Sequence, residues 1–551
     1  MAPLPAPPLP ALPPPPPPPP SLHAHGRNLT TIILAMSDDQ GWGEVGYRGH
    51  RILRTPHLAA MAAAGLRLER FYVSPVCSPT RAAALTGRAA DRTGVTDQGV
   101  PLRLGERKTL PRALQAAGWA TAHFGKWHLD GLHSVGMGGA PLLANGTHGP
   151  SAFGFGEWLS SFGVFDVDPV LSRNGQFEDF DGDSSDVLVA QAVRWLGAQR
   201  AAARRCLLAL WFASPHEPWI ALPADRAAAA GVFKSRYYGE IVALDRSIGT
   251  LRAGLRRLGV ENTTLLWFSS DNGGYHGLPV PANGPLRGFK KDIFEGGIRV
   301  PAIVEWPGAI APGRVSWYPS CIYDVFPTVV DALGLPRDAL LRPYDGSSLL
   351  RLFSRELPRR GKPILIAYKR RWALIDNEIK YVTAGGAHWF YNLSRAAGNA
   401  SRHRAAAAAV GSEDASDESY RLADRRLAAA NGSAPHAADA VARHVAWLRR
   451  QMARFMASVA ASQRGDDYPE GAEAAPLGAR VWCDTPEYRP HLAGLLARPQ
   501  FRPELRQLQA WNRSWWPEVF RAIDPRSVNL NLSARPRSRF EKLGGYLRIS
   551  G

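Results

Sequence analysis

Four apolar segments that end in polar side chains next to glycine or proline constrain the fold of this chain more than any other feature. The segments are 31–36, 119–125, 206–212 and 264–270, and they lead into Ser37-Asp38-Asp39, Lys126-Trp127-His128, Ser214-Pro215-His216 and Asp271-Asn272. Helical patterns lie between some of them, for example at 185–199 and 237–258. This alternation predicts an α/β fold with a largely parallel sheet. Because ligands of such sheets bind at the carboxyl ends of the strands, we expect the four polar endings to form one site.

A cysteine in a turn between Pro75 and Pro79 is the second constraining feature. An Ala-rich stretch of high helix propensity follows, which places Cys77 at or just before a helix N-terminus. Unpaired N–H groups and the helix dipole favour an anion there, and Arg81 and Arg88 add positive charge. Taken alone, the turn fits a small buried structural cysteine equally well. The polar strand ends favour the functional interpretation.

The polar groups at the strand ends are suited to a hard metal ion and an oxyanion. Asp38, Asp39, Asp271 and Asn272 offer only oxygen ligands, which suit Ca²⁺ or Mg²⁺ better than zinc or copper. Positive charge and transferable protons would come from Arg81, Lys126, His128, His216 and Lys290. Hydrolysis of a sulfate or phosphate ester requires such a set, because negative charge must be held and the leaving alkoxide protonated.

Composition limits the classes of partner. The 551 residues carry a formal net charge of +18, which attracts polyanions, but no known nucleic-acid-binding module occurs and we expect no nucleic-acid partner. No apolar run approaches the ~20 residues needed to span a bilayer, so we expect no membrane span. The four cysteines have no zinc-site spacing and allow at most one or two disulfides.

Asparagine usage indicates the compartment. Eight of the thirteen asparagines begin N-x-[ST] sequons, where roughly one is expected by chance. They are Asn28, Asn145, Asn262, Asn392, Asn399, Asn431, Asn512 and Asn531. We therefore expect a glycoprotein of the secretory pathway, extracellular or lysosome-like. The segment MAPLPAPPLPALPPPPPPPP has no recognisable signal peptide, so a signal lies upstream or this Pro-rich run replaces it.

The pattern along the chain predicts two domains. Residues 1–27 are expected to be a disordered Pro-rich tail, 28–362 a catalytic domain, and 363–551 a smaller C-terminal domain with a short antiparallel sheet at 363–382. An Ala/Arg-rich insertion occupies about 400–475, with a helix expected at 437–456. Trp511, Trp515 and Trp516 are expected to pack on the main domain rather than stack on sugars.

Several motifs together resemble a known family. Cys77-x-Pro79-x-Arg81, followed by Leu85-Thr86-Gly87-Arg88, resembles the signature of type I sulfatases, in which the cysteine is oxidised to Cα-formylglycine. The blocks Asp38-Asp39-x-Gly41-Trp42-Gly43, Gly125-Lys126-Trp127-His128-Leu129, Pro215-His216-x-Pro218, Asp271-Asn272-Gly273 and Lys290 are similar to other family blocks in the same order. The resemblance covers roughly residues 28–335 and is of the arylsulfatase type. The segment from Gly154-Phe155-Gly156-Glu157-Trp158 to Gly182-Asp183-Ser184-Ser185 weakly resembles the N-acetylgalactosamine-6-sulfatase-like branch. Thr80 stands where the family more often has serine.

The resemblance implies an alkaline phosphatase-like fold, in which a large, mostly parallel sheet is flanked by helices and joined to a smaller C-terminal domain. It implies one Ca²⁺ per chain, held by Asp38, Asp39, residue 77, Asp271 and Asn272. It also implies a formylglycine made from Cys77 by the formylglycine-generating enzyme, whose hydrate attacks the sulfur.

The same resemblance implies roles for the remaining site residues. Arg81 and Lys126 would stabilise the hydrate and the sulfate. His216 and Lys290 would assist the leaving alcohol. His128 would take the proton that releases sulfate.

Two other functions remain open on the sequence. One is a phosphodiesterase or phosphonate monoester hydrolase of the same superfamily, most of which use serine or threonine as nucleophile. The other is a catalytically silent glycan-binding glycoprotein with Cys77 unmodified. We expect the substrate to be a sulfated carbohydrate rather than an aryl or steroid sulfate, and the sequence indicates no oligomeric state.

Overall fold

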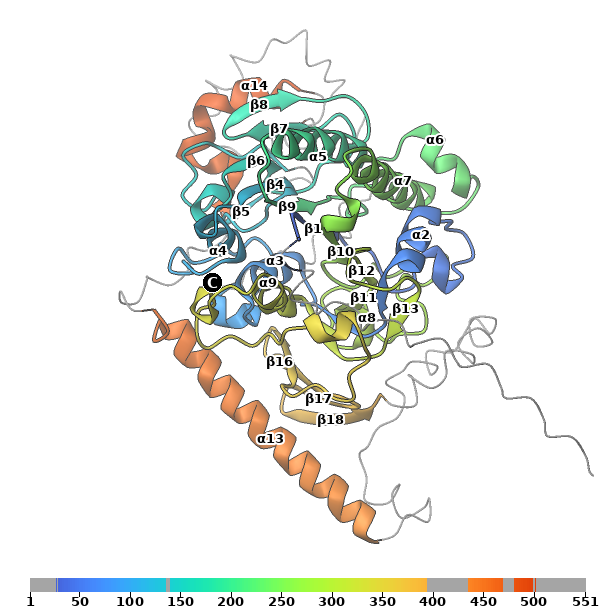
Figure 1. The fold of residues 1–551 in the computed structure, drawn as a ribbon, viewed down its shortest axis with the longest axis vertical. Coiled ribbons are helices and arrows are strands. Elements are labelled where there is room, and N and C mark those ends of the chain that lie inside the picture. The colour runs from blue at the N-terminus through green and yellow to red at the C-terminus, as the bar shows by residue number, and fades with distance from the viewer. Residues whose placement is uncertain are drawn as a thin grey trace, which may run out of the picture.

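The computed structural model describes residues 26, 28–134, 139–393, 435–468, 480–498 and 501, and it is built around one ten-stranded sheet (Figure 1). The strand order is β13-β2-β12-β10-β1-β9-β4-β6-β7-β8. The five strands β10, β1, β9, β4 and β6 pair in parallel, while β12, β7 and β8 run antiparallel to their neighbours. This mixed, mostly parallel sheet confirms the predicted fold class.

The elements have the following bounds. The strands of the large sheet are β1 Thr31–Ser37, β2 Leu66–Leu68, β4 Ala120–Lys126, β6 Glu157–Ser161, β7 Val170–Arg173, β8 Gln176–Asp179, β9 Cys206–Trp211, β10 Thr264–Ser270, β12 Ala302–Glu305 and β13 Arg314–Ser316. The helices are α2 Pro56–Ala64, α3 Cys77–Thr86, α4 Leu110–Ala116, α5 Ser184–Ala201, α6 Pro223–Arg226, α7 Ser235–Arg257, α8 Glu295–Ile298, α9 Val325–Leu333, α13 Pro435–Arg464 and α14 Leu492–Leu496.

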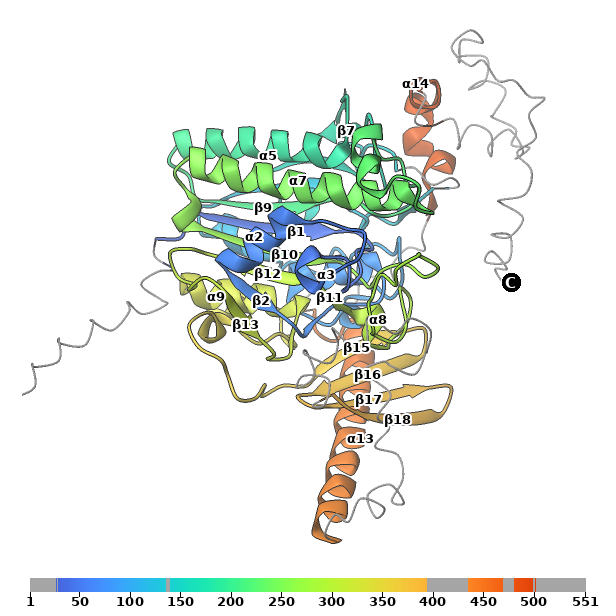
Figure 2. The same cartoon turned by 90° about the vertical axis from the view of Figure 1, so that its right-hand side faces the viewer.

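Helices cover both faces of the sheet. In Figure 2, α5 and α7 lie side by side, and their buried side chains belong to the core on one face of the sheet. The buried side chains of α3 and α9 belong to the core on the other face. Side chains of β1 alternate between the two cores, with Ile33 and Ala35 facing α2, α5 and α7, and Ile32 and Leu34 facing the opposite layer. Burial on both faces explains why the central strands are continuous apolar runs.

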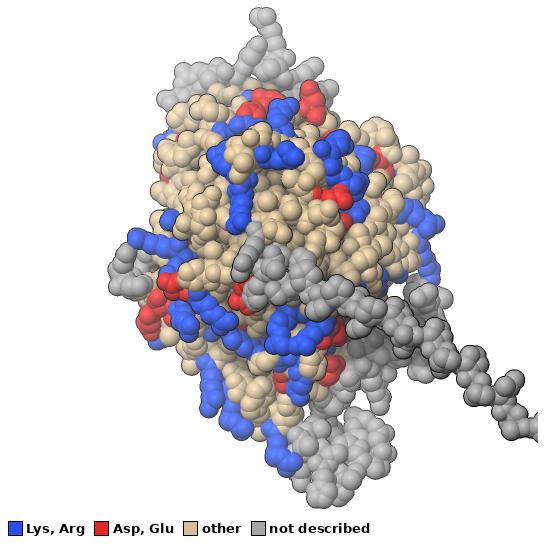
Figure 3. Space-filling view, viewed as in Figure 1, with Lys and Arg blue, Asp and Glu red and all other residues tan. Residues whose placement is uncertain are grey.

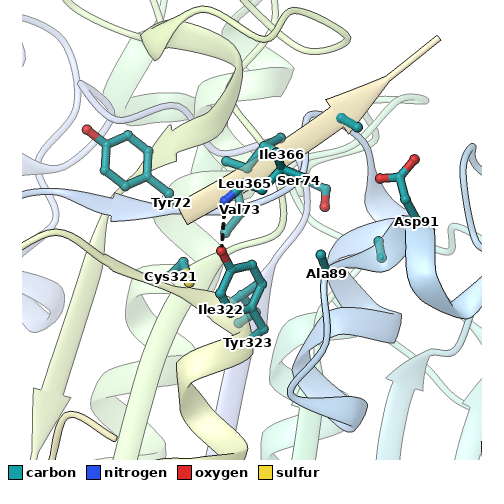
Figure 4. A pocket seen from close by; sticks show the side chains of 12 residues that line it. Tyr72, Val73, Ser74, Ala89, Asp91, Cys321, Ile322, Tyr323, Leu365 and Ile366 are labelled. Carbon is teal, nitrogen blue, oxygen red and sulfur yellow. Dashed lines mark hydrogen bonds between the residues drawn. The ribbon is translucent and has the colours of Figure 1, made fainter. Parts of the chain in front are cut away.

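A four-stranded antiparallel sheet follows, made of β15 Ile364–Tyr368, β16 Arg371–Asp376, β17 Ile379–Ala384 and β18 Ala387–Asn392. Its first strand meets the main body where the backbone N–H of Leu365 donates to the Tyr323 hydroxyl at 3.0 Å (Figure 4). Beside this bond, Tyr72, Ser74 and Cys321 help to line a cavity of about 10 Å³. A cavity of that size has room for about one water molecule and cannot hold a substrate.

The C-terminal elements divide between the two sheets. Helix α13 contains the predicted 437–456 helix, packs on the four-stranded sheet through Leu448 and Met452, and lies along it in Figure 1. Residues 480–498 return to the main body instead, where β19 (Arg480–Val481) pairs with β5 (Leu132–His133). The division at 362/363 stays our proposal, with 480–498 packed on the first part.

A few predictions concern surface and termini. Asn28, Asn145 and Asn262 are exposed, whereas the tail 1–25, Asn399, Asn431, Asn512, Asn531 and the three C-terminal tryptophans lie outside the described residues. All four cysteines are buried, and they form no disulfide bonds with one another. Among the helices described, none is long and apolar enough to cross a membrane. Basic side chains lie in several separate groups on the face shown in Figure 3, with acidic side chains among them.

Candidate active site

The four polar strand endings meet at the carboxyl edge of the parallel strands, as the sequence predicts. Asp38 follows β1, Lys126 ends β4, His216 follows β9 and Asp271 follows β10. The N-terminus of α3 brings Cys77 to the same edge, where its Sγ lies 3.6 Å from the Asp38 Oδ1 and 3.8 Å from the Lys126 Nζ. The structure therefore gathers every residue of the predicted site into one cluster.

Helix α3 explains the spacing of the cysteine motif. Cys77 is its first residue, after Val76 in an extended conformation, and every residue of α3 is buried. Cys77 and Arg81 are four residues apart, so they share one face of the helix. The Thr80 hydroxyl donates to the Ser74 carbonyl at 3.2 Å and accepts from its N–H at 3.0 Å, bonds that a serine could also make.

Arg81 holds three strand ends together. Its Nη2 donates to the carboxylates of Asp38 at 2.9 Å and Asp271 at 2.8 Å, and its Nη1 donates to the Lys126 carbonyl at 2.7 Å. The guanidinium lies 5.2 Å from the centre of the Trp211 ring, a cation–π arrangement. All of these groups are buried, so the charges compensate one another without water.

The end of β4 is shaped by a glycine. Gly125 has φ = 109°, and a Cβ there would lie 1.8 Å from the Trp211 carbonyl oxygen. The following Lys126 extends its Nζ to within 2.6 Å of the Asp38 carboxylate. His128 lies two residues on with φ = 57°, a left-handed conformation that is costly without glycine and recurs at functional sites.

Among the predicted site residues, Asp39 also has a left-handed backbone, at φ = 67°. Its carboxylate accepts hydrogen bonds from Lys290 Nζ at 2.7 Å and Asn272 Nδ2 at 2.6 Å, and the His216 Nε2 lies 3.6 Å away. The backbone N–H of Asp39 donates to the Asp271 carboxylate at 3.1 Å. The two strand ends β1 and β10 are thus tied through their acidic residues.

The surroundings shift the pKa values of Asp38 and Asp271 in opposite directions. Burial raises the pKa of a carboxyl group, yet Lys126 and the other nearby cations lower the pKa of Asp38 below its ordinary value. Burial, together with the charges of Asp38 and Asp39, raises the pKa of Asp271 to about 7 despite Arg81. Three carboxylates thus face three cations, Arg81, Lys126 and Lys290, and Asp271 is more readily protonated than Asp38.

The surroundings of the two histidines favour the neutral imidazole, because they lower the pKa of both rings. Burial and the Lys290 charge lower the pKa of His216 to about 4, and its Nδ1 lies 2.6 Å from the Glu217 carbonyl, to which it must donate. Burial and the charges of Lys126 and Arg81 lower the pKa of His128 well below its usual value. The buried Nδ1 of His128 has no hydrogen-bond partner.

The donor set fits a hard cation. The Oδ1 of Asn272 is buried without a hydrogen-bond partner, and the surrounding acceptors are carboxylate oxygens. Within the described ranges, one group of His, Cys and carboxylate side chains has ligand atoms within 4.8 Å of one another: Asp38, Asp39, Cys77 and His216. Asp271 is not in that group; its Oδ1 accepts from the Asp39 N–H and its Oδ2 accepts from Arg81.

Calcium is expected to stabilise the protein through this site. At one hundred times its dissociation constant, Ca²⁺ should add about 2.7 kcal/mol to the free energy of unfolding, seen as a rise in Tm. In Asn272→Ala the rise should shrink, because an oxygen donor is lost. Glu305→Gln, which alters a carboxylate paired with Arg252 away from the site, should keep the full rise. An equal rise in wild type and Asn272→Ala would contradict the predicted ligand.

Two residues near the site had not been predicted. The sequence placed Trp211 in an apolar strand and gave it no role in the site, but its ring lies against Arg81. Asp166 follows β6; it is buried, neither carboxylate oxygen has a partner, and burial with the charges of Asp183 and Asp38 raises its pKa. If residues 157–161 had been recognised as a fifth parallel strand, Asp166 would have been expected at the same edge of the sheet as the site.

Comparisons with known proteins agree with this geometry. The family model described as Sulfatase matches residues 30–335. The N-acetylgalactosamine-6-sulfatase of Canis lupus familiaris is 32% identical over 361 residues, which cover 58% of this chain and 65% of that protein. The steryl-sulfatase of Mus musculus is 29% identical over 432 residues, which cover 61% and 67%. The chain thus spans less than two thirds of the N-acetylgalactosamine-6-sulfatases that it matches.

A solved structure supports the fold. The crystal structure of Ps i-CgsB superposes with a TM-score of 0.64 at 22% identity, covering 86% of this chain and 99% of that chain. The alkaline phosphatase-like arrangement expected from the motifs is therefore confirmed. Because the family model matches more than half of the 551 residues, the chain belongs to the sulfatase family.

Proposed function

We propose that the protein is a sulfuric ester hydrolase that removes sulfate from a carbohydrate. The observation that carries this proposal is the position of Cys77 between an acidic cluster and fixed cations, with Lys126 Nζ 3.8 Å from its sulfur. The family membership of the chain supports the same reaction. A silent binding protein would have no need of this charge arrangement around a buried thiol.

Two groups complete the proposed site. Asp38, Asp39, Asp271 and Asn272 would hold Ca²⁺, which neutralises negative charge on the sulfate oxygens, and a formylglycine made from Cys77 would supply a hydroxyl nucleophile. The cysteine itself is a poor candidate for that role, because burial and the Asp38 charge raise the pKa of its thiol far above neutrality.

The cations of the chain would bind and orient the ester. Lys126 and Arg81 place positive charge beside residue 77, so they can hold sulfate oxygens as charge develops. Burial opposes the charge of Lys290, but Asp39 and Cys77 raise its pKa well above its usual value. Lys290 therefore remains protonated and can donate a hydrogen bond to the leaving oxygen.

The histidines would move protons. His128 is neutral with an unpartnered Nδ1, so it can accept a proton near residue 77. His216 is also neutral, but the negative charge of a bound sulfate ester would raise its pKa again. In that protonated state its Nε2, which faces Asp39, can donate to the leaving oxygen.

A sulfated carbohydrate is the proposed substrate class. The net charge of +18 favours a polyanion, and relatives named N-acetylgalactosamine-6-sulfatase match with higher identity than the steryl-sulfatase. Exposed sequons at Asn28, Asn145 and Asn262 support a secretory, extracellular or lysosome-like location. There the formylglycine-generating enzyme would be a transient partner during maturation.

Two measurements test the proposal. Mass spectrometry of the Cys77 peptide, from protein made in a eukaryotic secretory pathway, should find formylglycine. The same preparation should hydrolyse an aryl sulfate faster than the matching aryl phosphate. A wholly unmodified thiol, or faster phosphate release, would refute the proposed activity.

A further inference from the structure

An aromatic surface adjoins the proposed sulfate site, and none of the proposed chemistry uses it. We call it the aromatic platform; its rings are Trp219, Tyr275, His276 and Phe289, with Ile220, Phe233 and Lys234 at its edge. Six large hydrophobic side chains are exposed in the described residues, and three of them are Ile220 at 48%, Phe233 at 63% and Phe289 at 41%. Exposed apolar side chains gathered at one place indicate a binding surface.

The platform is continuous with the site because the same loops build both. Trp219 lies three residues after His216, on the loop that follows β9. Tyr275 lies on the loop that follows β10, and Phe289 comes directly before Lys290. The charges of Asp39 and Lys290 also act on Tyr275, which places this ring close enough to the site for a substrate held there to extend toward it.

The rings form an unbroken row. The centroids of Trp219 and Tyr275 are 5.7 Å apart at an interplanar angle of 85°, and those of Tyr275 and His276 are 5.9 Å apart at 16°. His276 and Phe289 follow at 4.8 Å and 48°. These distances lie within the range of direct aromatic contacts, so the row is one surface.

The row is held in place from beneath. Trp219 packs edge-on against the buried Tyr237 at 5.3 Å, and its Nε1 donates to the Pro215 carbonyl at 3.1 Å. A surface that is rigid before binding loses little entropy when a ligand arrives.

We propose that the aromatic platform binds the sugar rings next to the sulfated residue of an oligosaccharide. A pyranose ring has an apolar C–H face that matches the negative face of an aromatic ring. Lys234, whose Nζ lies 4.8 Å from the Trp219 ring centre, would attract a sulfate or carboxylate on that neighbouring sugar. This inference rests on the proposed function, since it names the part of the substrate that extends beyond the ester.

The open geometry favours an oligosaccharide over a steroid. Phe233 and Phe289 are among the most exposed large hydrophobic side chains described, whereas a steroid needs a deep apolar slot that covers both of its faces. A ring that lies on a platform keeps its other face, and its charged substituents, in water. The binding energy of the contacts between the neighbouring sugars and the platform would also help to orient the ester in the site.

Binding to an inactive protein tests the platform apart from catalysis. In full-length Cys77→Ala protein, titration calorimetry would measure Kd for hexasaccharides of chondroitin sulfate and heparan sulfate. Adding Phe289→Ala should weaken the tightest of these complexes about tenfold, and Trp219→Ala should act in the same direction. Phe289→Tyr keeps the ring and should restore affinity, while Val315→Ala, an exposed residue on β13, should change Kd less than twofold.

Activity assays of the formylglycine-containing protein separate this proposal from the proposed function. For each protein, kcat/KM for the hexasaccharide is divided by kcat/KM for an aryl sulfate. This ratio should be about ten times larger for wild type than for Phe289→Ala. Hydrolysis of both substrates with no change in Kd or in this ratio would overturn the platform. Platform-dependent binding without any sulfate release would instead overturn the proposed function and support the platform.

Discussion

Alanine in place of Cys77 is expected to abolish sulfate release and leave the fold intact. The sulfur is buried at the first residue of α3, 3.6 Å from the Asp38 carboxylate, and the remaining site residues do not depend on it for their positions. Loss of a covalent nucleophile removes the route through which the other groups act. The kcat/KM for an aryl sulfate should fall at least about a thousandfold, measured beside thermal unfolding by circular dichroism.

Cys321→Ala is the matched control. This cysteine is also buried and free, and its Sγ lies 3.9 Å from an Arg360 nitrogen, outside the site. Both variants lose one buried sulfur and should lose similar stability, so only the effect on turnover should differ. Activity of Cys77→Ala within tenfold of wild type would rule out residue 77 as the nucleophile.

The sequence predicted the centre of the sheet well because burial there leaves a simple pattern. β1, β9 and β10 are six or seven residues long and buried throughout, so they read as unbroken apolar runs. Each also ends in polar groups, which located the carboxyl edge. The site followed from this grouping, since five parallel strands bring their ends to the same side.

The edges of the sheet were not predicted. β2, β12 and β13 are three or four residues long, too short for a periodic pattern to be distinguished from a loop. Their positions depend on partners far along the chain, such as the pairing of Ile303 with Arg67. The position of 480–498 was not predicted for the same reason. Its strand β19 pairs with β5, which lies more than 300 residues earlier in the chain, and no local sequence pattern indicates this pairing.

Loop side chains account for what was missed around the site. The motifs identified His216 and Lys290, but no sequence pattern connects their neighbours Trp219 and Phe289 with each other. Only the folded loops show that these rings belong to one row with Tyr275. Loops carry function because a rigid scaffold positions them, and that positioning is tertiary information.

Arg252→Met is the control for Arg81→Met, the second variant with a large expected effect. Arg252 forms two hydrogen bonds to Glu305, at 2.8 and 2.7 Å, between α7 and β12. Its loss should lower stability, because the Glu305 carboxylate is mostly buried. No residue of the site is involved, so activity should persist and calcium should raise Tm by the same amount as in wild type.

Arg81→Met is expected to remove activity and to destabilise the calcium-free protein by about 3–5 kcal/mol. The change keeps the length of the side chain but leaves the carboxylates of Asp38 and Asp271 buried without their shared cation. Lys126 still faces Asp38, so the excess charge falls mainly on Asp271. If these acids hold Ca²⁺, adding the ion should recover part of the lost stability in Arg81→Met and more than it adds to wild type, as measured by urea unfolding. Equal calcium effects in Arg81→Met and Arg252→Met would show that the carboxylates joined by Arg81 do not bind the metal.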